Sequence, residues 1–344
     1  MGSRARQRIR IMKKFFVSLV MLLSLSAANV FAQSSLIATL SHEGEITAFY
    51  GADALKEAHE AAAHGDAITL SSGTFSATDI TKAITLRGAG MQVYTINNVL
   101  PTLINGDFTI QIAEGVSEKL TIEGICHLDR ISSNCKLSGA RFIKSRLGRV
   151  SLAYFANASF LHCKIIEYMY LEHSDCIFNN CYVADCRPTN SSSQFYNCIL
   201  VDDGDGIGLK DLEYASLYNC ILIGKESSSG DRLPSSCVVY NCTGVNCYDA
   251  TCFKDVPIAL NVEQSIFTDT FKDYTGIYSD DITFELTDKA KKWLGTDGTQ
   301  QGIYGGNFPY DPTTSNPHIT KCNVAAKSTA DGKLSVDIEV AGVE

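Results

Sequence analysis

A four-residue pattern recurs through the middle of the chain and constrains the fold more than any other feature. Each copy holds an apolar residue, a variable residue, a polar residue and then cysteine. The copies are Phe160-Leu161-His162-Cys163, Phe178-Asn179-Asn180-Cys181, Phe195-Tyr196-Asn197-Cys198, Leu217-Tyr218-Asn219-Cys220 and Val239-Tyr240-Asn241-Cys242. In an earlier copy, residues 142–145, serine replaces cysteine. The fourth positions follow one another after 18, 18, 17, 22 and 22 residues. A period of this length is typical of a solenoid.

A β-solenoid stacks equivalent residues, because each strand pairs with the same strand one turn away at about 4.8 Å. We therefore expect a buried column of cysteines that act as small apolar fillers. We expect a second column of buried corner asparagines, each amide bonding the asparagines above and below it. The two columns are Cys163, Cys181, Cys198, Cys220 and Cys242, and Asn180, Asn197, Asn219 and Asn241.

The spacing also argues against two other kinds of solenoid. A left-handed β-helix of hexapeptides keeps a stricter count, and leucine-rich repeats need an L-x-x-L-x-L frame that this chain lacks. The fold class expected is all-β, a parallel β-solenoid over residues 67–286. This length leaves room for about ten or eleven turns.

A short helix is expected just before the first strands. Residues 53–64 have helical spacing, with Asp53 as a plausible N-cap and Gly65 as the terminating residue. The run that follows, GDAITLSSGTF (65–75), resembles the start of the right-handed parallel β-helix of the pectate-lyase-like superfamily. The resemblance implies that the helix caps the first coil and that residues 33–66 form an N-terminal cap.

The C-terminal part, residues 287–344, departs from the repeat. Residues 287–294 predict a short helix capped by Thr287, and residues 318–327 and 332–340 alternate like half-exposed strands. Solenoid ends must be closed against edge-to-edge pairing, which favours a small β cap here; a docking segment for a partner is the alternative. The ending, with GIYGG and DGKLSVDIEV, looks like that of secreted β-helix proteins of Bacteroides-type bacteria, most of which have no assigned role.

The first 32 residues predict a signal peptide. Lys13 and Lys14 precede an apolar run over residues 15–25, and cleavage is expected after Ala32. Met12 is the more ordinary start, so residues 1–11 are interpreted as a misassigned start. An N-terminal membrane anchor is the alternative. We expect an exported protein, located in the periplasm, on the outer cell surface or in the medium.

Removal of residues 1–32 leaves an acidic chain. The full sequence has 29 basic and 38 acidic residues, and the signal peptide holds six of the basic ones, so the formal charge falls from −9 to −15. This charge argues against nucleic-acid partners. It is compatible with calcium, with neutral glycans or simply with solubility. No later stretch is long and apolar enough to predict a membrane span.

Thirteen cysteines in an exported chain first suggest disulfides. Stacked side chains point the same way, however, which suits a disulfide poorly. We interpret most of the cysteines as buried free thiols. Two local pairs, Cys176 with Cys186 and Cys237 with Cys247, stay open as disulfides.

The strongest candidate for chemistry is the loop VDDGDGIGLKD, residues 201–211. Asp202, Asp203 and Asp205 repel one another unless a cation or raised pKa values relieve them, and calcium suits such oxygen ligands. Asp202 and Asp203 are alternatively a catalytic acid–base pair, with Lys210 as a neighbouring base. Polygalacturonases resemble this in using an aspartate pair, but their other motifs are missing here. A solvated turn between coils is the third interpretation.

Two further groups are candidates for binding. Arg141, Lys144, Arg146 and Arg149 form a basic cluster that would suit the carboxylates of an acidic glycan. Tyr168 and Tyr170 are two residues apart, so they share one strand face and suit stacking on sugar rings. The alternatives are ion pairs with neighbouring acids for the arginines and lysine, and packing for the tyrosines.

These features favour a non-catalytic exported protein that binds a polysaccharide or another surface molecule along its sheet face. Two alternatives stay open, because a fold does not determine a function. The resemblance makes a polysaccharide lyase or glycoside hydrolase the first. A structural spacer or adhesin is the second.

Overall fold

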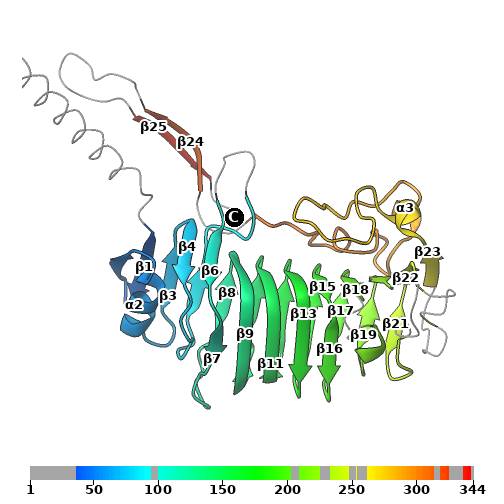
Figure 1. Ribbon diagram of the computed structural model, residues 1–344, viewed down its shortest axis with the longest axis horizontal. Helices are drawn as coiled ribbons and strands as arrows, with labels where there is room; N and C mark the ends of the chain where they lie inside the picture. Colours follow the sequence, from blue (N-terminus) through cyan, green and yellow to red (C-terminus); the bar gives the residue numbers. More distant parts are fainter. Residues whose placement is uncertain are drawn as a thin grey trace, which may run out of the picture. The chain divides into compact units, whose positions relative to one another are not determined.

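Two largely parallel sheets wind through the protein as a β-solenoid of about 8 turns (Figure 1). The structure, a computed structural model, describes residues 36–93, 100–202, 209–224, 233–247, 253, 262–313, 318–324 and 336–341. All of these residues belong to one unit that starts at Leu36. The prediction of an all-β parallel solenoid is confirmed.

From β3 in the first sheet and β4 in the second, the order of strands follows the chain, as expected when each turn adds one strand to each sheet. The first sheet holds β2 (Glu45–Tyr50), β1 (Ile37–His42), β3 (Ala67–Leu70), β5 (Thr85–Arg87), β8 (Thr121–Glu123), β10 (Arg141–Ile143), β12 (Ala158–Leu161), β14 (Cys176–Asn179), β17 (Gln194–Tyr196), β19 (Ser216–Tyr218) and β21 (Val238–Tyr240). The second holds β4 (Gly73–Ser76), β6 (Thr102–Asn105), β9 (Ile125–Ser138), β11 (Arg146–Ala156), β13 (Lys164–Glu172), β15 (Tyr182–Ala184), β18 (Ile199–Val201), β20 (Ile221–Ile223), β22 (Cys242–Val245) and β23 (Val262–Ser265). Beside this path, β7 (Phe108–Ile110) pairs with β9, and β16 (Cys186–Thr189) pairs with β13.

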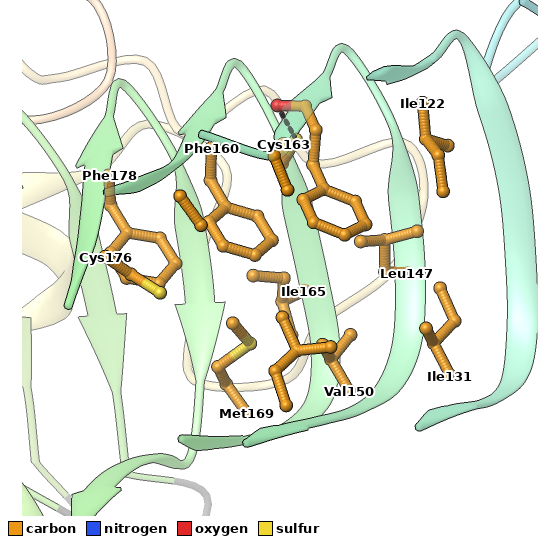
Figure 2. Packing of buried hydrophobic residues seen from close by; sticks show 14 of the residues in the cluster. Ile122, Ile131, Leu147, Val150, Phe160, Cys163, Ile165, Met169, Cys176 and Phe178 are labelled. Atoms are coloured by element: carbon orange, nitrogen blue, oxygen red, sulfur yellow. Dashed lines mark hydrogen bonds between the residues drawn. The ribbon is translucent and has the colours of Figure 1, made fainter. Parts of the chain in front are cut away.

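The apolar first position of the repeat forms a column of rings inside the solenoid. Phe142, Phe160, Phe178 and Phe195 pair in register on successive strands, and all four are fully buried. Their ring centroids are 4.6 to 4.7 Å apart and the rings are stacked. Figure 2 shows Phe160 and Phe178 beside Ile165 and Met169 of the opposite sheet. Burial of each ring stabilises the fold by about 1.5–3 kcal/mol.

The solenoid has fewer turns than the ten or eleven expected, because one turn is much longer than the repeat. Leu86 of β5 pairs with Ile122 of β8, so that turn takes 36 residues. In addition, the last strand that the structure describes in either parallel sheet ends at Ser265.

The third position of the repeat is the corner where the chain turns from the first sheet to the second. All six corner residues have a positive φ, between 46° and 56°; they are Lys144, His162, Asn180, Asn197, Asn219 and Asn241. We call them the corner column. Asparagine tolerates this left-handed conformation better than most residues. The conformation therefore explains why asparagine dominates this position.

The asparagine side chains do not follow the expected ladder from one asparagine to the next. Their described partners lie on residues 266–313, which we call the return segment. Asn180 Nδ2 donates to the carbonyl oxygens of Ile303 and Gly305, both at 2.8 Å. Asn219 Oδ1 accepts from the amide of Thr296 at 2.8 Å. The partners that these side chains do have lie on this segment, because the side chains point out of the coil toward it; the side-chain oxygens of Asn197 and Asn241 have none among the described residues.

The return segment runs back along the corner column, as can be followed in yellow and orange in Figure 1. Asn241 donates to Leu294, near the end of the solenoid. His162 Nε2 lies 3.0 Å from the carbonyl oxygen of Phe308, two turns before Asn197. Lys144, earlier still, donates to Asp311 at 3.2 Å and to the carbonyl oxygen of Thr313. The segment thus passes over at least five turns in the direction opposite to the growth of the coil.

The thiols of the cysteine column point at backbone oxygens. Cys181 Sγ, for example, lies 3.4 Å from the carbonyl oxygen of Phe160 in the preceding turn and 3.2 Å from that of Asn179. The other four make the same two contacts at 3.3 to 3.5 Å; they are Cys163, Cys198, Cys220 and Cys242. All eleven cysteines whose side chains the structure describes are free, including both local pairs that were left open.

The N-terminal end is closed by antiparallel strands and a helix. β1 pairs antiparallel with both β2 and β3, and α2 (Ala54–Ala61) follows β2. The helix is shorter than expected, because Ala62 is already extended, and Asp53 makes no side-chain cap bond.

The rest of the helical structure is short. α3 (Phe267–Thr270) and the 3-10 turn η4 (Ala290–Lys292) lie in the return segment; Thr287 Oγ1 accepts from the Ala290 amide at 3.2 Å, but the residue that caps η4 is Lys289. β24 (His318–Val324) and β25 (Val336–Ala341) form an antiparallel pair in the two segments where strands were expected. Within the ranges described, no helix is both long and apolar enough to cross a membrane.

Candidate functional site

The structure describes the two ends of the acidic loop, residues 201–202 and 209–211. Asp202 follows β18 and is buried, with its amide donating to the carbonyl oxygen of Ile223. It lines a cavity of about 440 Å³ between the second sheet and the return segment, together with Tyr274 and Tyr278. Asp203 and Asp205 lie outside the described residues. Among the residues that are described, no group of three His, Cys, Asp or Glu is placed to hold a metal ion.

The other predicted binding residues lie apart from this loop and from one another. Lys210 is exposed on the 3-10 turn η1 (Leu209–Asp211). Arg141 is exposed on β10 in the first sheet. Arg146, at the start of β11, pairs with Asp280 of the return segment at 2.6 Å. The basic cluster is dispersed because the corner at Lys144 separates the two sheets, so neighbours in sequence face different directions.

Tyr168 and Tyr170 do share a face, as predicted from their spacing. Ile131, Val150 and Met169 are paired in register on β9, β11 and β13, and all three point into the solenoid (Figure 2). Since successive side chains on a strand point to opposite faces, the residues flanking these three point outward.

The outward residues form a continuous group, which we call the arginine–tyrosine face. One row pairs Arg130, Arg149 and Tyr168, and the next pairs Ser132, Ser151, Tyr170 and Arg187. Arg130 and Arg187 are exposed, and the tyrosines are half-buried. The structure therefore brings two predicted tyrosines together with three arginines, of which sequence reasoning singled out only Arg149.

The charges on this face leave cationic groups available. Arg149 Nε is 3.2 Å from a carboxylate oxygen of Glu167, and both side chains are nearly half exposed, so the pair contributes little stability. For Arg130 and Arg187, no ion pair is found within the described part of the chain. Exposed guanidinium groups attract anions.

A second aromatic group was missed from the sequence. Tyr196, Tyr218 and Tyr240 stack on the outer side of the first sheet, with ring centroids 4.7 and 4.5 Å apart. Burial and the neighbouring tyrosines raise the pKa of Tyr218. The Tyr-Asn-Cys triplet repeated three times was the signal for it. Because the rings cover one another's faces, the column offers ring edges and hydroxyls rather than a stacking platform.

A second cavity lies beside Arg146. It has a volume of about 380 Å³ and is bounded by β9, β11 and β13 on one side and by residues 278–281 on the other. Lys164 is buried at this cavity.

Comparison with known proteins adds no identification: no protein-family model, curated protein or solved structure matches the chain. The geometry alone therefore supports the function proposed next.

Proposed function

We propose that this is an exported, non-catalytic protein that binds an acidic polysaccharide on the arginine–tyrosine face. We also propose that the solenoid is a right-handed parallel β-helix of the pectate-lyase-like superfamily, of the kind secreted by Bacteroides-type bacteria. The helix α2 before the first turn and the long parallel strands β9, β11 and β13 support this relationship.

The observation that carries the binding proposal is the pairing of arginine with tyrosine across neighbouring strands. Arg149 is paired in register with Tyr168, and Arg187 is paired in register with Tyr170. A guanidinium binds a carboxylate with two parallel hydrogen bonds, which a lysine does not do. A tyrosine beside it adds an apolar ring surface and a hydroxyl. This combination suits a polymer of acidic sugars.

The repeat distance also fits a polymer. Strands of one sheet are about 4.8 Å apart, so each turn offers a new set of side chains at roughly the length of one sugar unit. A flat face of this kind binds through several weak contacts at once, which raises the overall affinity. Two carboxylates beside the arginine–tyrosine face are engaged by it: Glu167 lies 3.2 Å from Arg149 Nε, and Asp107 accepts from the backbone amide of Arg130 at 2.9 Å.

The test is affinity electrophoresis of the chain from Gln33 onward in gels that contain polygalacturonate or the neutral polymer dextran. The wild type is expected to be retarded by polygalacturonate only, and the retardation to weaken with salt. Arg149→Ala is expected to weaken binding by at least about tenfold, since a charge-assisted hydrogen bond contributes roughly 1.5–3 kcal/mol.

Arg141→Ala is the matched control, because Arg141 is an exposed strand arginine on the other sheet. It is expected to bind as the wild type does. Equal losses in the two variants would show that binding depends on overall charge and not on this face. Absence of retardation of the wild type by polygalacturonate would refute the proposed function.

A further inference from the structure

The 380 Å³ cavity holds a lysine whose surroundings do not satisfy it. Lys164, on β13, is only 5% exposed. No hydrogen bond or ion pair of its Nζ is found among the described residues; the contacts found are to aromatic rings. Nζ lies 6.0, 6.0 and 5.8 Å from the ring centroids of Tyr278, Phe284 and Tyr310.

Ring contacts alone do not compensate for the burial of an ammonium group. A cation–π contact at this distance contributes about 0.5–2 kcal/mol, whereas removing an ion from water costs several kcal/mol. Burial accordingly lowers the pKa of Lys164, although Asp280 acts in the opposite direction. No acceptor oxygen for the N–H donors of the charged group is found in the described structure, so an acceptor supplied from outside can bind there.

Other polar atoms around the lysine also lack a hydrogen-bond partner among the described residues. The hydroxyl oxygens of Tyr278 and Tyr310 and the Nε of Arg146 are buried without a hydrogen-bond partner among the described residues. Tyr278 and Arg146 line the cavity with Lys164. Buried polar groups are normally satisfied, and a group of unsatisfied donors around one cavity indicates a missing acceptor.

The two acidic groups at this cavity are exposed. Asp280 is engaged by Arg146 at 2.6 Å and its side chain is 58% exposed, so it lies at the rim. Asp281 is exposed as well. The opposite wall is apolar and is made by Met91, Val93, Pro101 and Leu103. The cavity thus has a buried cationic group, Lys164, at its inner end and apolar side chains along one wall.

From this arrangement we propose that the cavity is a binding site for a small organic carboxylate with an apolar body. The carboxylate accepts from Lys164 Nζ and from the Tyr278 hydroxyl, and the apolar part packs on Met91 and Leu103. A cation is repelled by Lys164, and a neutral molecule leaves its charge unpaired. A volume of about 380 Å³ is within the usual range for small-molecule sites. This site does not depend on the proposed polysaccharide binding.

The experiment measures binding of carboxylates and of their neutral analogues to the purified chain from Gln33 onward. The probes are acetate, hexanoate and benzoate, compared with hexanol and benzamide, in isothermal titration and in ligand-observed NMR. We expect at least one of the larger carboxylates to bind at millimolar concentration or below. We expect its neutral analogue to bind at least about tenfold more weakly.

Two variants and one control assign the binding to this cavity. Lys164→Met keeps the length of the stem and removes the charge, and is expected to weaken carboxylate binding by at least about tenfold. Tyr278→Phe removes only the hydroxyl and is expected to weaken it less. Lys144→Met is the control, since Lys144 is a partly buried lysine that already has Asp311 as a partner. Both lysine variants are checked for a wild-type circular dichroism spectrum.

The proposal is overturned if none of the three carboxylates binds, which would indicate that water alone fills the cavity. It is also overturned if Lys164→Met and Lys144→Met bind carboxylate equally well. If the wild type binds a small carboxylate but not polygalacturonate, the proposed function is refuted and the carboxylate site is supported.

Discussion

The backbone amide of Thr296 donates to the side-chain oxygen of Asn219 at 2.8 Å, across 77 residues of sequence. The carbonyl oxygen of Asn219 in turn accepts from the amide of Gly302 at 2.9 Å. One corner residue of the solenoid therefore holds the return segment at two points. The same residue has a φ of +56°, so it combines a turn in the coil with attachment of a distant segment.

Replacement of Asn219 should separate these two roles. Asn219→Gly keeps the left-handed conformation accessible and removes only the acceptor for Thr296, which should cost about 0.5–1.5 kcal/mol. Asn219→Ala loses the acceptor and is also strained at positive φ, which should add about 1–2 kcal/mol. Denaturant unfolding followed by circular dichroism measures the free energy of unfolding of each variant and so gives their order of stability.

Asn197→Gly is the control and should lower the free energy of unfolding less than Asn219→Gly, since the Asn197 side-chain oxygen has no partner among the described residues. Equal losses for glycine and alanine at Asn219 would show that the conformation does not matter there.

A methyl group at Gly305 should detach part of the return segment. An added Cβ would overlap the carbonyl oxygen of Gln300 and approach Asn197 Oδ1 to 3.0 Å. We expect Gly305→Ala to cost about 1–3 kcal/mol and to speed proteolytic cleavage within residues 294–313. Gly298→Ala is the comparison, because nothing lies within 4 Å of its added Cβ and only its φ of +77° is unfavourable. Cleavage at the same rate in both variants would mean that the segment shifts enough to accommodate the added methyl group.

The cysteine column should be chemically inert in the folded protein. Burial raises the pKa of the Cys163 and Cys198 thiols well above the usual value, and the thiolate is the reactive form. Alkylation of the native protein at pH 8, followed by peptide mass spectrometry, should leave both unlabelled. Cys135, which is half-buried, should be labelled. Alkylation in denaturant should label all three. Rapid labelling of Cys163 in the native state would contradict the buried column.

The pair of His42 and Asp66 should give a pH dependence at the N-terminal end. His42 Nδ1 is 2.9 Å from both carboxylate oxygens of Asp66, and this hydrogen bond, with the charge of Asp66, raises the pKa of His42. The stability from the charged histidine is complete below about pH 6.5 and is lost as the pH rises through the raised value. An NMR titration should show a pKa above 6.5 that returns toward 6.5 in Asp66→Asn. An unchanged value in that variant would exclude the pair as the cause.

The repeat predicted the core well, because its apolar and cysteine positions are spaced by one turn of a coil. Phe160 and Phe178 stack, and Cys163 and Cys181 are buried, as the spacing requires. The corner partners were not predictable in the same way. Asn180 forms hydrogen bonds to residues more than 120 positions away, and no local pattern in residues 303–305 predicts that contact.

The arginine–tyrosine face shows a second limit. Leu147 pairs with Ile165, a separation of 18, but Arg149 pairs with Tyr168, a separation of 19, because the register shifts between them. Counting from the cysteine frame therefore places outward residues of β13 one position off. The pairing of Tyr170 with Arg187 is hidden by the same kind of shift. Insertions of one residue are tolerated in a solenoid because each turn is closed independently of the next.

The direction of the return segment has a consequence for how the chain completes its fold. Neighbouring turns of a solenoid pair soon after each is made, and their contacts are short in sequence. Lys144 and Asp311, by contrast, meet across 167 residues. A chain that emerges from its N-terminus can therefore wind its coils early, yet its middle turns stay without their covering until residues 294–313 are present. Truncated copies would expose the corners of these turns, and a protease could distinguish them from finished molecules.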